Sequence, residues 1–464
     1  MRTRDLTRRE FLRIAGITGV GLIAAACAPA APPPTAAPPP PQIVKETVVV
    51  AGTPQVVEKV VTATPAPPTP TAAAAPTTLY ISGAQSLTGA FAEDSAAVLA
   101  GYQDYAKYVN ETKLLAPWKT DKFPANVTLE VLWRDDALDP QKALSIYDEL
   151  KSKMLVYRIS GSPTGLALVD RLNDDRMGAP SMSSSPAWLS PPRTILTYYP
   201  IYTDCLGAIA DWFLTTWKDT SRKPRVAYLT ADNAMGHSIE IPELRAYLEK
   251  AGYEYVGAQY VPLVPTAPPT TQVLWLKDNK VDLALGVMIN PGSQPTYKEM
   301  VRNDMGPNKG YKITLGLALP SHLQVFLPAM GDLAEGFIVG GGFISWDDPA
   351  PGVKFLNDLQ TKYRADKKVT HIMYAGGLIE AMTQVEALRL AMLATPVDKL
   401  KPVDVLENGF FKLKNFDTGS LTATPLTYGP SKVEGIDKVR VDQIQKGKIA
   451  NLGVFPSHHI YKHE

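Results

Sequence analysis

Two short loops carry the residue types that could hold a small polar molecule. The first, residues 160–165, reads Ser-Gly-Ser-Pro-Thr-Gly; it follows an apolar run ending at Ile159 and precedes a helical pattern over 166–174. Backbone N–H groups at the start of a helix have no intrahelical partners and attract carboxylates and other oxygen acceptors. The pattern predicts either a ligand site at Ser162 or simple helix capping by Ser162 or Thr164.

The second loop, residues 181–186, contains a serine run about twenty residues further along the chain. It should follow the next strand, and ligands of parallel sheets bind at the carboxyl ends of strands. We therefore expect Ser183, Ser184 and Ser185 either to belong to a ligand site at this edge or to form an ordinary solvated loop.

Catalytic patterns give little support for an enzyme. The chain contains no H-E-x-x-H, Walker, G-x-S-x-G or dinucleotide-binding motif. Glycines 340–342 lack the spacing of a phosphate loop and favour a hinge, and Cys205 has no histidine nearby in the sequence. His458, His459 and His463 have no adjacent carboxylate or cysteine pattern, which favours an exposed C-terminal tail over a metal site. We expect no catalytic activity, no cofactor and no metal.

Apolar runs alternate with helical patterns from Leu79 onward. The runs that predict strands are 79–82, 127–133, 155–159, 226–229, 253–260, 281–287, 313–317 and 336–344. The helical patterns are 96–110, 140–154, 239–251 and 377–394. Asp139 is expected to cap the helix that begins at Pro140. This alternation predicts an α/β fold whose parallel sheets are covered by helices on both faces.

The N-terminus has the pattern of an export signal. Residues 7–13 contain paired arginines, residues 14–26 are apolar and small, and Cys27 follows three alanines. About 13 apolar residues are too few to span a hydrocarbon core of about 30 Å. The segment resembles a twin-arginine lipoprotein signal, which implies cleavage and acylation at Cys27 and a lipid tether on the outer face of the cell membrane.

The composition limits what the exported part can be. Residues 28–77 are rich in Pro, Ala and Thr and predict a disordered linker, in which 43–61 could form a transient strand. After signal cleavage only Cys205 is left beside the acylated cysteine, so no disulfide is expected. The balance of 47 basic and 46 acidic residues argues against a nucleic-acid partner.

Four motifs carry a resemblance to a known family over residues 78–464. They are the opening strand and Leu-Thr-Gly at 79–89, the D-D-x-x-D-P-x-x-A pattern at 133–143, and weaker landmarks at 252–256 and 334–337. The chain resembles the leucine/isoleucine/valine-binding type of periplasmic solute-binding protein. The resemblance implies a type I fold, in which two Rossmann-like lobes with parallel sheets are joined by a three-strand hinge and close like a Venus flytrap.

The resemblance also implies a division of the chain. The expected parts are 1–27 (signal and lipidation site), 28–77 (linker), 78–203 (lobe 1, first part), 204–340 (lobe 2, first part), 341–430 (lobe 1, second part) and 431–464 (lobe 2, C-terminal part). Hinges are expected near 202–204, near 340–342 and at about Gly429.

The family's binding residues match eight positions. The matching residues are Ser162, which corresponds to the carboxylate-binding serine, Ser183, Ser184 and Ser185 in the head-group segment, and Asp94, Met235, Asn290 and Tyr374 around the cleft. The glutamate that pairs with a ligand α-amine is replaced by Ala318 or Leu319. An ordinary α-amino acid is therefore disfavoured unless Asp94 substitutes, whereas an aromatic or aliphatic acid, an amide or a polyol stays compatible.

Together these features predict an extracytoplasmic receptor of an ABC importer. It would bind a small polar ligand, amino-acid-like, carboxylate or amide, between its lobes and deliver it to the permease subunits. We expect a monomer held to the membrane by its lipid anchor. A ligand-sensing receptor that signals to a membrane partner is the alternative, and an exported enzyme is less favoured.

Overall fold

The computed structural model describes residues 42–50, 53–61, 75–182, 185–189, 191–319, 321–341, 346 and 348–461. The chain divides into two units, residues 1–72 and 73–464. The predicted signal with Cys27 lies outside the described residues, as do Ser183 and Ser184. None of the helices in the described ranges combines the length and the apolar character that a bilayer crossing requires.

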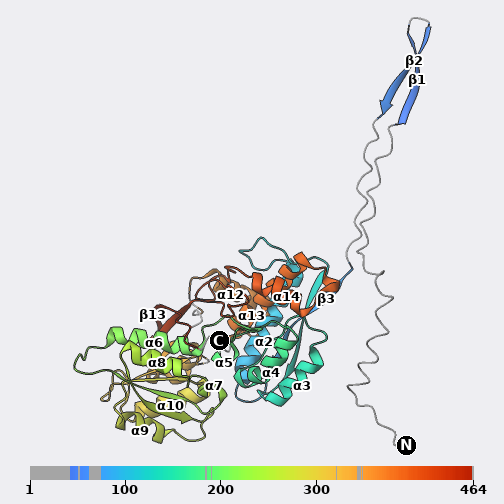
Figure 1. Ribbon diagram of the computed structural model, residues 1–464. Helices are drawn as coiled ribbons and strands as arrows, with labels where there is room; N and C mark the ends of the chain where they lie inside the picture. Colours follow the sequence, from blue (N-terminus) through green and yellow to red (C-terminus); the bar gives the residue numbers. More distant parts are fainter. Residues whose placement is uncertain are drawn as a thin grey trace, which may run out of the picture. The chain divides into compact units, whose positions relative to one another are not determined.

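The first unit contains a β-hairpin. Strand β1 (Gln42–Val50) pairs in antiparallel register with β2 (Thr53–Val61), from Gln42 opposite Val61 to Val50 opposite Thr53 (Figure 1). The strand that the sequence allows at 43–61 within the expected linker is thus a hairpin of two strands. Both are rich in valine, which favours extended backbone, and each supplies the other with hydrogen-bond partners.

The second unit begins with a parallel sheet in what we call the first lobe, defined by strands β3 to β6 and the helices packed on them. Strand β3 (Thr77–Gln85) pairs with β4 (Val127–Asp135), and β5 (Ala179–Ser181) pairs with β6 (Ile195–Thr197). The two predicted strands at 79–82 and 127–133 are confirmed. Strands β5 and β6 were not predicted, since three residues give too short a pattern to recognise.

The predicted strand at 155–159 is an extended segment between β3 and β5. Ala84 N donates to Arg158 O at 3.1 Å, and Tyr157 N donates to Gly178 O at 3.1 Å. The segment therefore joins the two strand pairs into one layer, although it does not form a regular ladder.

Helices cover the first lobe, and Figure 1 shows α2, α3, α4, α13 and α14 grouped around β3. The helices are α2 (Ala92–Thr112), α3 (Pro140–Leu150), α4 (Ser162–Asp174), α5 (Pro186–Leu189), α12 (Pro351–Tyr363), α13 (Met373–Ala394) and α14 (Pro402–Asn408). The predicted cap of α3 is confirmed, because Asp139 Oδ1 accepts from the backbone N–H groups of Gln141 and Lys142 at 2.8 and 3.0 Å.

The second lobe is built on a seven-stranded sheet. From edge to edge its strands are β13 (Lys448–Pro456), β12 (Lys438–Gln445), β11 (Ile338–Gly340), β10 (Thr314–Ala318), β9 (Leu283–Val287), β7 (Arg225–Ala231) and β8 (Glu254–Val261). The strands from β11 to β8 are parallel, and β12 is antiparallel to both β11 and β13. The predicted strands are confirmed in β7 to β10, whereas β11 is shorter than the predicted 336–344 and β12 and β13 were not predicted.

The helices of the second lobe complete its layers. They are α6 (Tyr202–Thr216), α7 (Ala234–His237), α8 (Pro242–Ala251), α9 (Thr270–Asp278), α10 (Asn290–Arg302) and α11 (Leu323–Met330). Helix α6 packs on β9 to β13, which buries its apolar face.

Two of the segments that connect the lobes run side by side. Thr197, at the end of β6, accepts from Gly435 N at 2.7 Å and donates its own N–H to Val433 O at 2.8 Å. Residues 433–435 therefore extend the sheet of the first lobe just before the chain enters β12. The division of the chain predicted from sequence remains a proposal.

Helices α2 and α13 approach so closely that glycine is required between them. A Cβ atom on Gly377 would lie 2.0 Å from Val98 O, which is backbone and cannot move aside easily. We predict that Gly377→Ala lowers the free energy of unfolding by roughly 2 kcal/mol, because the overlap outweighs the gain of about 1 kcal/mol in helix propensity.

Urea unfolding followed by circular dichroism measures this change. Gly429→Ala is the matched control, since its Cβ would meet only Lys414 Nζ at 3.7 Å. Equal stability of the two variants would contradict the close approach of α2 and α13.

Candidate functional site

A small cavity opens where strand ends of the first lobe meet the beginnings of α2 and α13. Its lining residues are Phe91, Asp94, Ser95, Val98, Arg158, Ile159, Ser160, Ser181, Met182, Met373 and Glu380. The cavity volume is about 10 Å³, room for about one water molecule. The position agrees with the general rule that ligands of parallel sheets bind at the carboxyl ends of strands.

A buried ion pair forms the floor of this cavity. Arg158 Nε donates to Glu380 Oε2 at 2.7 Å and Arg158 Nη1 donates to Ala84 O at 2.8 Å, and the two charged side chains are 5% and 1% exposed. Glu380 accepts three further hydrogen bonds, from Tyr102 Oη, Tyr198 Oη and Met182 N. Burial raises the pKa of Glu380, and the Arg158 guanidinium opposes that shift. Both carboxylate oxygens of Glu380 are thus hydrogen-bonded, and Arg158 balances the charge of Glu380.

An aspartate and two histidines meet above the cavity. Asp94 Oδ1 lies 3.2 Å from His371 Nε2 and 3.7 Å from His322 Nε2. Asp94 and His371 belong to the first lobe, and His322 lies between β10 and α11 of the second, so this cluster joins the two lobes. We call Asp94, His322 and His371 the interlobe cluster.

Burial controls the charge of the interlobe cluster. It raises the pKa of Asp94 to about 7, and the nearby charge of Glu93 adds to the shift. Burial also lowers the pKa of His371, and it lowers the pKa of His322 strongly, with a further contribution from His371. Both imidazoles are therefore neutral at pH 7, while Asp94 is close to half protonated.

Asn290, at the start of α10, holds His322 in place. Its Nδ2 donates to His322 O at 3.2 Å and its Oδ1 accepts from His322 N at 2.9 Å. Both polar atoms of the amide therefore bind the backbone of residue 322, and Asn290 positions the histidine that faces Asp94.

The first serine loop is organised by an aspartate of the D-D motif. Asp136 accepts from Ser86 Oγ at 2.7 Å, from Leu138 N at 2.9 Å and from Ser160 Oγ. Thr164 Oγ1 accepts from Gly161 N at 3.2 Å, so Thr164 rather than Ser162 provides the local cap. Ser162 Oγ instead lies 3.2 Å from Tyr202 Oη and is 3% exposed.

The other predicted binding residues are spread over the molecule. Ser185 is buried before α5, and its Oγ has no hydrogen-bond partner among the described residues. Met235 is buried in α7. Tyr374 is buried in α13, and its hydroxyl donates to Asp104 Oδ2 at 3.0 Å. Of the predicted residues that the structure describes, Asp94 alone is among the cavity-lining residues, and Ser162, Ser185, Met235, Asn290 and Tyr374 are not. Asn290 binds the backbone of His322, whose ring lies 3.7 Å from Asp94.

The position of the missing family glutamate is apolar, as expected. Ala318 ends β10 and is fully buried, and Leu319 is 3% exposed. His322, three residues after Leu319, brings its Nε2 within 3.7 Å of Asp94 Oδ1 from the second lobe.

A scan of protein-family models matches residues 78–432 to the model described as periplasmic binding protein. The chain belongs to this family. The resemblance seen in its motifs is thereby confirmed, together with the type I fold of two lobes with largely parallel sheets.

Solved structures of other binding proteins share this fold. A branched-chain amino acid ABC transporter protein from Thermus thermophilus with bound valine is 18% identical, with a TM-score of 0.72, and the alignment covers 83% of this chain and 98% of that one. A fatty acid ABC transporter substrate-binding protein from Thermomonospora curvata is 21% identical, with a TM-score of 0.66 and coverage of 83% and 95%. A solute-binding protein from Rhodopseudomonas palustris BisB5 in complex with 3,4-dihydroxybenzoic acid is 17% identical, with a TM-score of 0.64 and coverage of 82% and 98%. A search of curated protein sequences finds no match to this periplasmic binding protein.

The sequence analysis missed four residues of this binding protein's cavity region: Arg158, Glu380, His322 and His371. A signal was present for two of them. Arg158 interrupts an apolar strand pattern, and Glu380 lies in the apolar helical pattern of α13. A charge that must be buried requires a partner, and that requirement could have singled out both residues.

The C-terminal histidines also differ from expectation. His459 Nδ1 lies 2.6 Å from Glu434 Oε2, and His458 Nε2 lies 2.7 Å from Asp211 Oδ2. His458 is exposed and the side chain of His459 is 41% exposed, so what the sequence did not predict is their pairing with carboxylates that are distant in sequence. His463 lies outside the described residues.

The raised pKa of Asp94 predicts a pH-dependent stability. Its folded-state pKa of about 7 exceeds the ordinary value of 3.8, so the folded protein binds the extra proton and loses stability as pH rises from about 4 to 7. Asp94→Asn, which mimics the protonated carboxyl, should be more stable than the wild type by up to about 4 kcal/mol at pH 8 and by only about 1 kcal/mol at pH 4.5.

Urea unfolding at the two pH values measures this difference. Asp358→Asn, which changes an exposed carboxylate on α12, should shift stability by less than about 0.5 kcal/mol at either pH. A stability difference for Asp94→Asn that does not change between pH 4.5 and pH 8 would refute the shifted pKa.

The buried pair predicts a large loss of stability when one partner is removed. Arg158→Ala leaves the Glu380 carboxylate buried without its cation and should lower the free energy of unfolding by about 3–5 kcal/mol. The control Lys354→Ala breaks the exposed pair with Asp358, whose atoms lie 2.6 Å apart, and should cost below about 1 kcal/mol. Thermal and chemical unfolding measure the stability of the two variants. Similar losses of stability in Arg158→Ala and Lys354→Ala would mean that the pair of Arg158 and Glu380 is not buried.

Proposed function

We propose that this protein is the solute-binding receptor of an ABC importer, which captures a small polar solute outside the cytoplasm and delivers it to the permease. The family match over 78–432 carries this proposal, since members of the family are extracytoplasmic binding proteins. The polar groups at the strand ends, with His322 of the other lobe close to Asp94, support it. The cavity among them has a volume of about 10 Å³, so a solute larger than water would enter only after the lining residues move apart.

The solute class follows from the groups around the cavity. The neighbours with bound valine and with 3,4-dihydroxybenzoic acid both bind a carboxylic acid. In this chain Ala318 and Leu319 offer no anion to an amine, and the Arg158 charge is already balanced by Glu380. We therefore propose a small carboxylate or amide, held by hydroxyls and backbone N–H groups at the start of α4 and by Asp94. An amino acid fits only if Asp94 is ionised and pairs with its amine.

Closure around the solute would be a shift of population between open and closed forms. A solute favours the closed form only through contacts that it makes in that form and not in the open one. The interlobe cluster supplies such contacts, because Asp94 and His322 come from opposite lobes. The paired segments at Thr197 and 433–435 are among the connections about which the lobes would rotate.

The placement of the receptor extends the proposal. We propose that Cys27 carries the lipid anchor, that residues 28–77 connect the anchor to the binding domain, and that the receptor acts as a monomer. The lobe boundaries near 203, 340 and 430 are part of the same proposal.

Identification of a bound solute tests this function. The full chain is purified in detergent, its solute is identified by native mass spectrometry, and affinity is measured by isothermal titration calorimetry. We expect one solute per chain, and a loss of affinity of about tenfold or more in Asp94→Ala and Ser162→Ala, since one hydrogen bond to a charged group contributes about 1.5–3 kcal/mol.

Ser145→Ala is the matched control, because this serine is exposed on α3 and bonds only Gln141 O. Its affinity should equal that of the wild type. If no solute is released and no compound from a panel of acids, amides and amino acids binds, the receptor proposal fails.

A further inference from the structure

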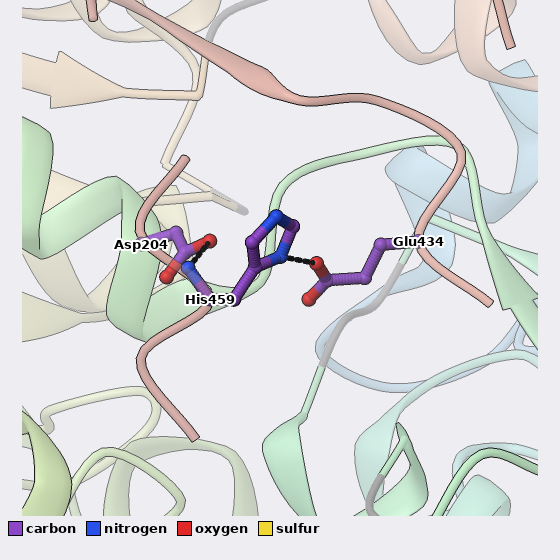
Figure 2. Close-up of side chains that lie close together, drawn as sticks. All are labelled: Asp204, Glu434 and His459. Atoms are coloured by element: carbon purple, nitrogen blue, oxygen red, sulfur yellow. Dashed lines mark hydrogen bonds and ion pairs between the residues drawn. The ribbon is translucent and has the colours of Figure 1, made fainter. Parts of the chain in front are cut away.

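Three side chains of metal-binding types meet beside the connection between the lobes, away from the solute cavity (Figure 2). Asp204 lies in the first turn of α6, Glu434 lies next to β6, and His459 follows β13. One possible ligand atom from each of the three lies within 4.8 Å of the others. Residues from three distant parts of the sequence are thus placed within the reach of one ion. We call them the hinge cluster.

The hinge cluster holds two buried carboxyl groups and one imidazole. Asp204 is 0% exposed and Glu434 is 3% exposed. Asp204 accepts from Ser457 Oγ and from the backbone N–H groups of His459 and Ile460, none of which carries a charge. Two carboxyl groups buried this deeply need hydrogen-bond or ion partners for their oxygens.

One carboxylate oxygen has no hydrogen-bond partner. His459 Nδ1 lies 2.6 Å from Glu434 Oε2, but Glu434 Oε1 is buried and has no partner among the described residues. In Figure 2 the carboxylates of Asp204 and Glu434 lie on the two sides of His459. A buried oxygen without a partner costs about 1–3 kcal/mol, so this atom is an independent sign that a bound cation belongs in the cluster.

We infer that Asp204, Glu434 and His459 bind a divalent transition-metal ion. One imidazole nitrogen and two carboxylate oxygens are a donor set suited to Zn²⁺, with water in the remaining position. Mg²⁺ and Ca²⁺ prefer sets made of oxygen alone and are less suited to His459. The ion would coordinate Glu434 Oε1, the buried oxygen without a hydrogen-bond partner among the described residues.

The site has a structural consequence. Residues 433 and 435, on either side of Glu434, bond to Thr197 of the first lobe, whereas Asp204 and His459 belong to the second. A metal held by all three joins the lobes where two chain connections run together. The inference does not depend on the identity of the solute, because the hinge cluster shares no residue with the cavity.

Zinc titration of the full chain tests the inference. The protein, purified without a histidine tag, is stripped with EDTA, dialysed, and titrated with ZnCl₂ by isothermal titration calorimetry; CoCl₂ provides a visible ligand-field spectrum. We expect one Zn²⁺ per chain and a higher melting temperature in its presence. Glu434→Gln and His459→Ala should each weaken zinc binding at least tenfold and remove the cobalt band.

His458→Ala is the matched control, because this neighbouring histidine bonds Asp211 outside the cluster. It should bind zinc as the wild type does. Glu434→Gln keeps the shape of the side chain, so it decides the question even if His459→Ala unfolds, which circular dichroism would reveal. No zinc binding at micromolar concentrations, or unchanged affinity in Glu434→Gln, would overturn the inference.

Discussion

The buried pair of Arg158 and Glu380 is the interaction on which the solute-facing surface of the first lobe depends. It connects the segment that leads into the first serine loop to the middle of α13, and through Ala84 it also connects to β3. A buried ion pair adds little net stability compared with apolar packing, but it penalises any arrangement that separates its partners. The pair therefore fixes where the loop, the helix and the strand lie relative to each other.

The second lobe contributes His322 to the surroundings of Asp94, which lines the cavity. His322 is carried by a turn whose backbone is fixed by Asn290, and its neutral ring comes close to Asp94. The charged groups around the cavity are thus paired with each other, as Arg158 and Glu380 are, or partly neutralised, as Asp94 is near pH 7. Such a surface discriminates solutes by hydrogen bonding and shape more than by attraction between full charges.

Much of this architecture can be read from the sequence, because strands buried on both faces leave continuous apolar runs. That signal identified the buried strands β3, β7, β9 and β10, and apolar runs also identified β4 and β8, which are partly exposed. It missed β12, which is mostly buried but whose sequence is interrupted by charged and amide residues, and β13, which is an edge strand with many exposed positions. The valine-rich strands β1 and β2 were taken as part of a proline-rich linker, since a hairpin depends on pairing that composition does not record.

The cavity was harder to predict for a related reason. Asp94 came from the family resemblance, but Arg158 and Glu380 are 222 residues apart, and only the fold shows that each is the other's partner. The carboxylate partners of His458 and His459 were not predicted for the same reason, because they come from other elements. Sequence patterns identify elements well, whereas pairs of distant polar residues require tertiary structure.

At the edge of the second lobe, the two hydrogen bonds of Asn290 fix the backbone of residue 322 independently of its side chain. Both bonds go to the main chain of residue 322 and none to its side chain. The side chain at this position can therefore change in the course of evolution while the backbone that carries it stays where it is. A substitution of residue 322 alone could therefore change which solutes are accepted, while the surrounding backbone keeps its position.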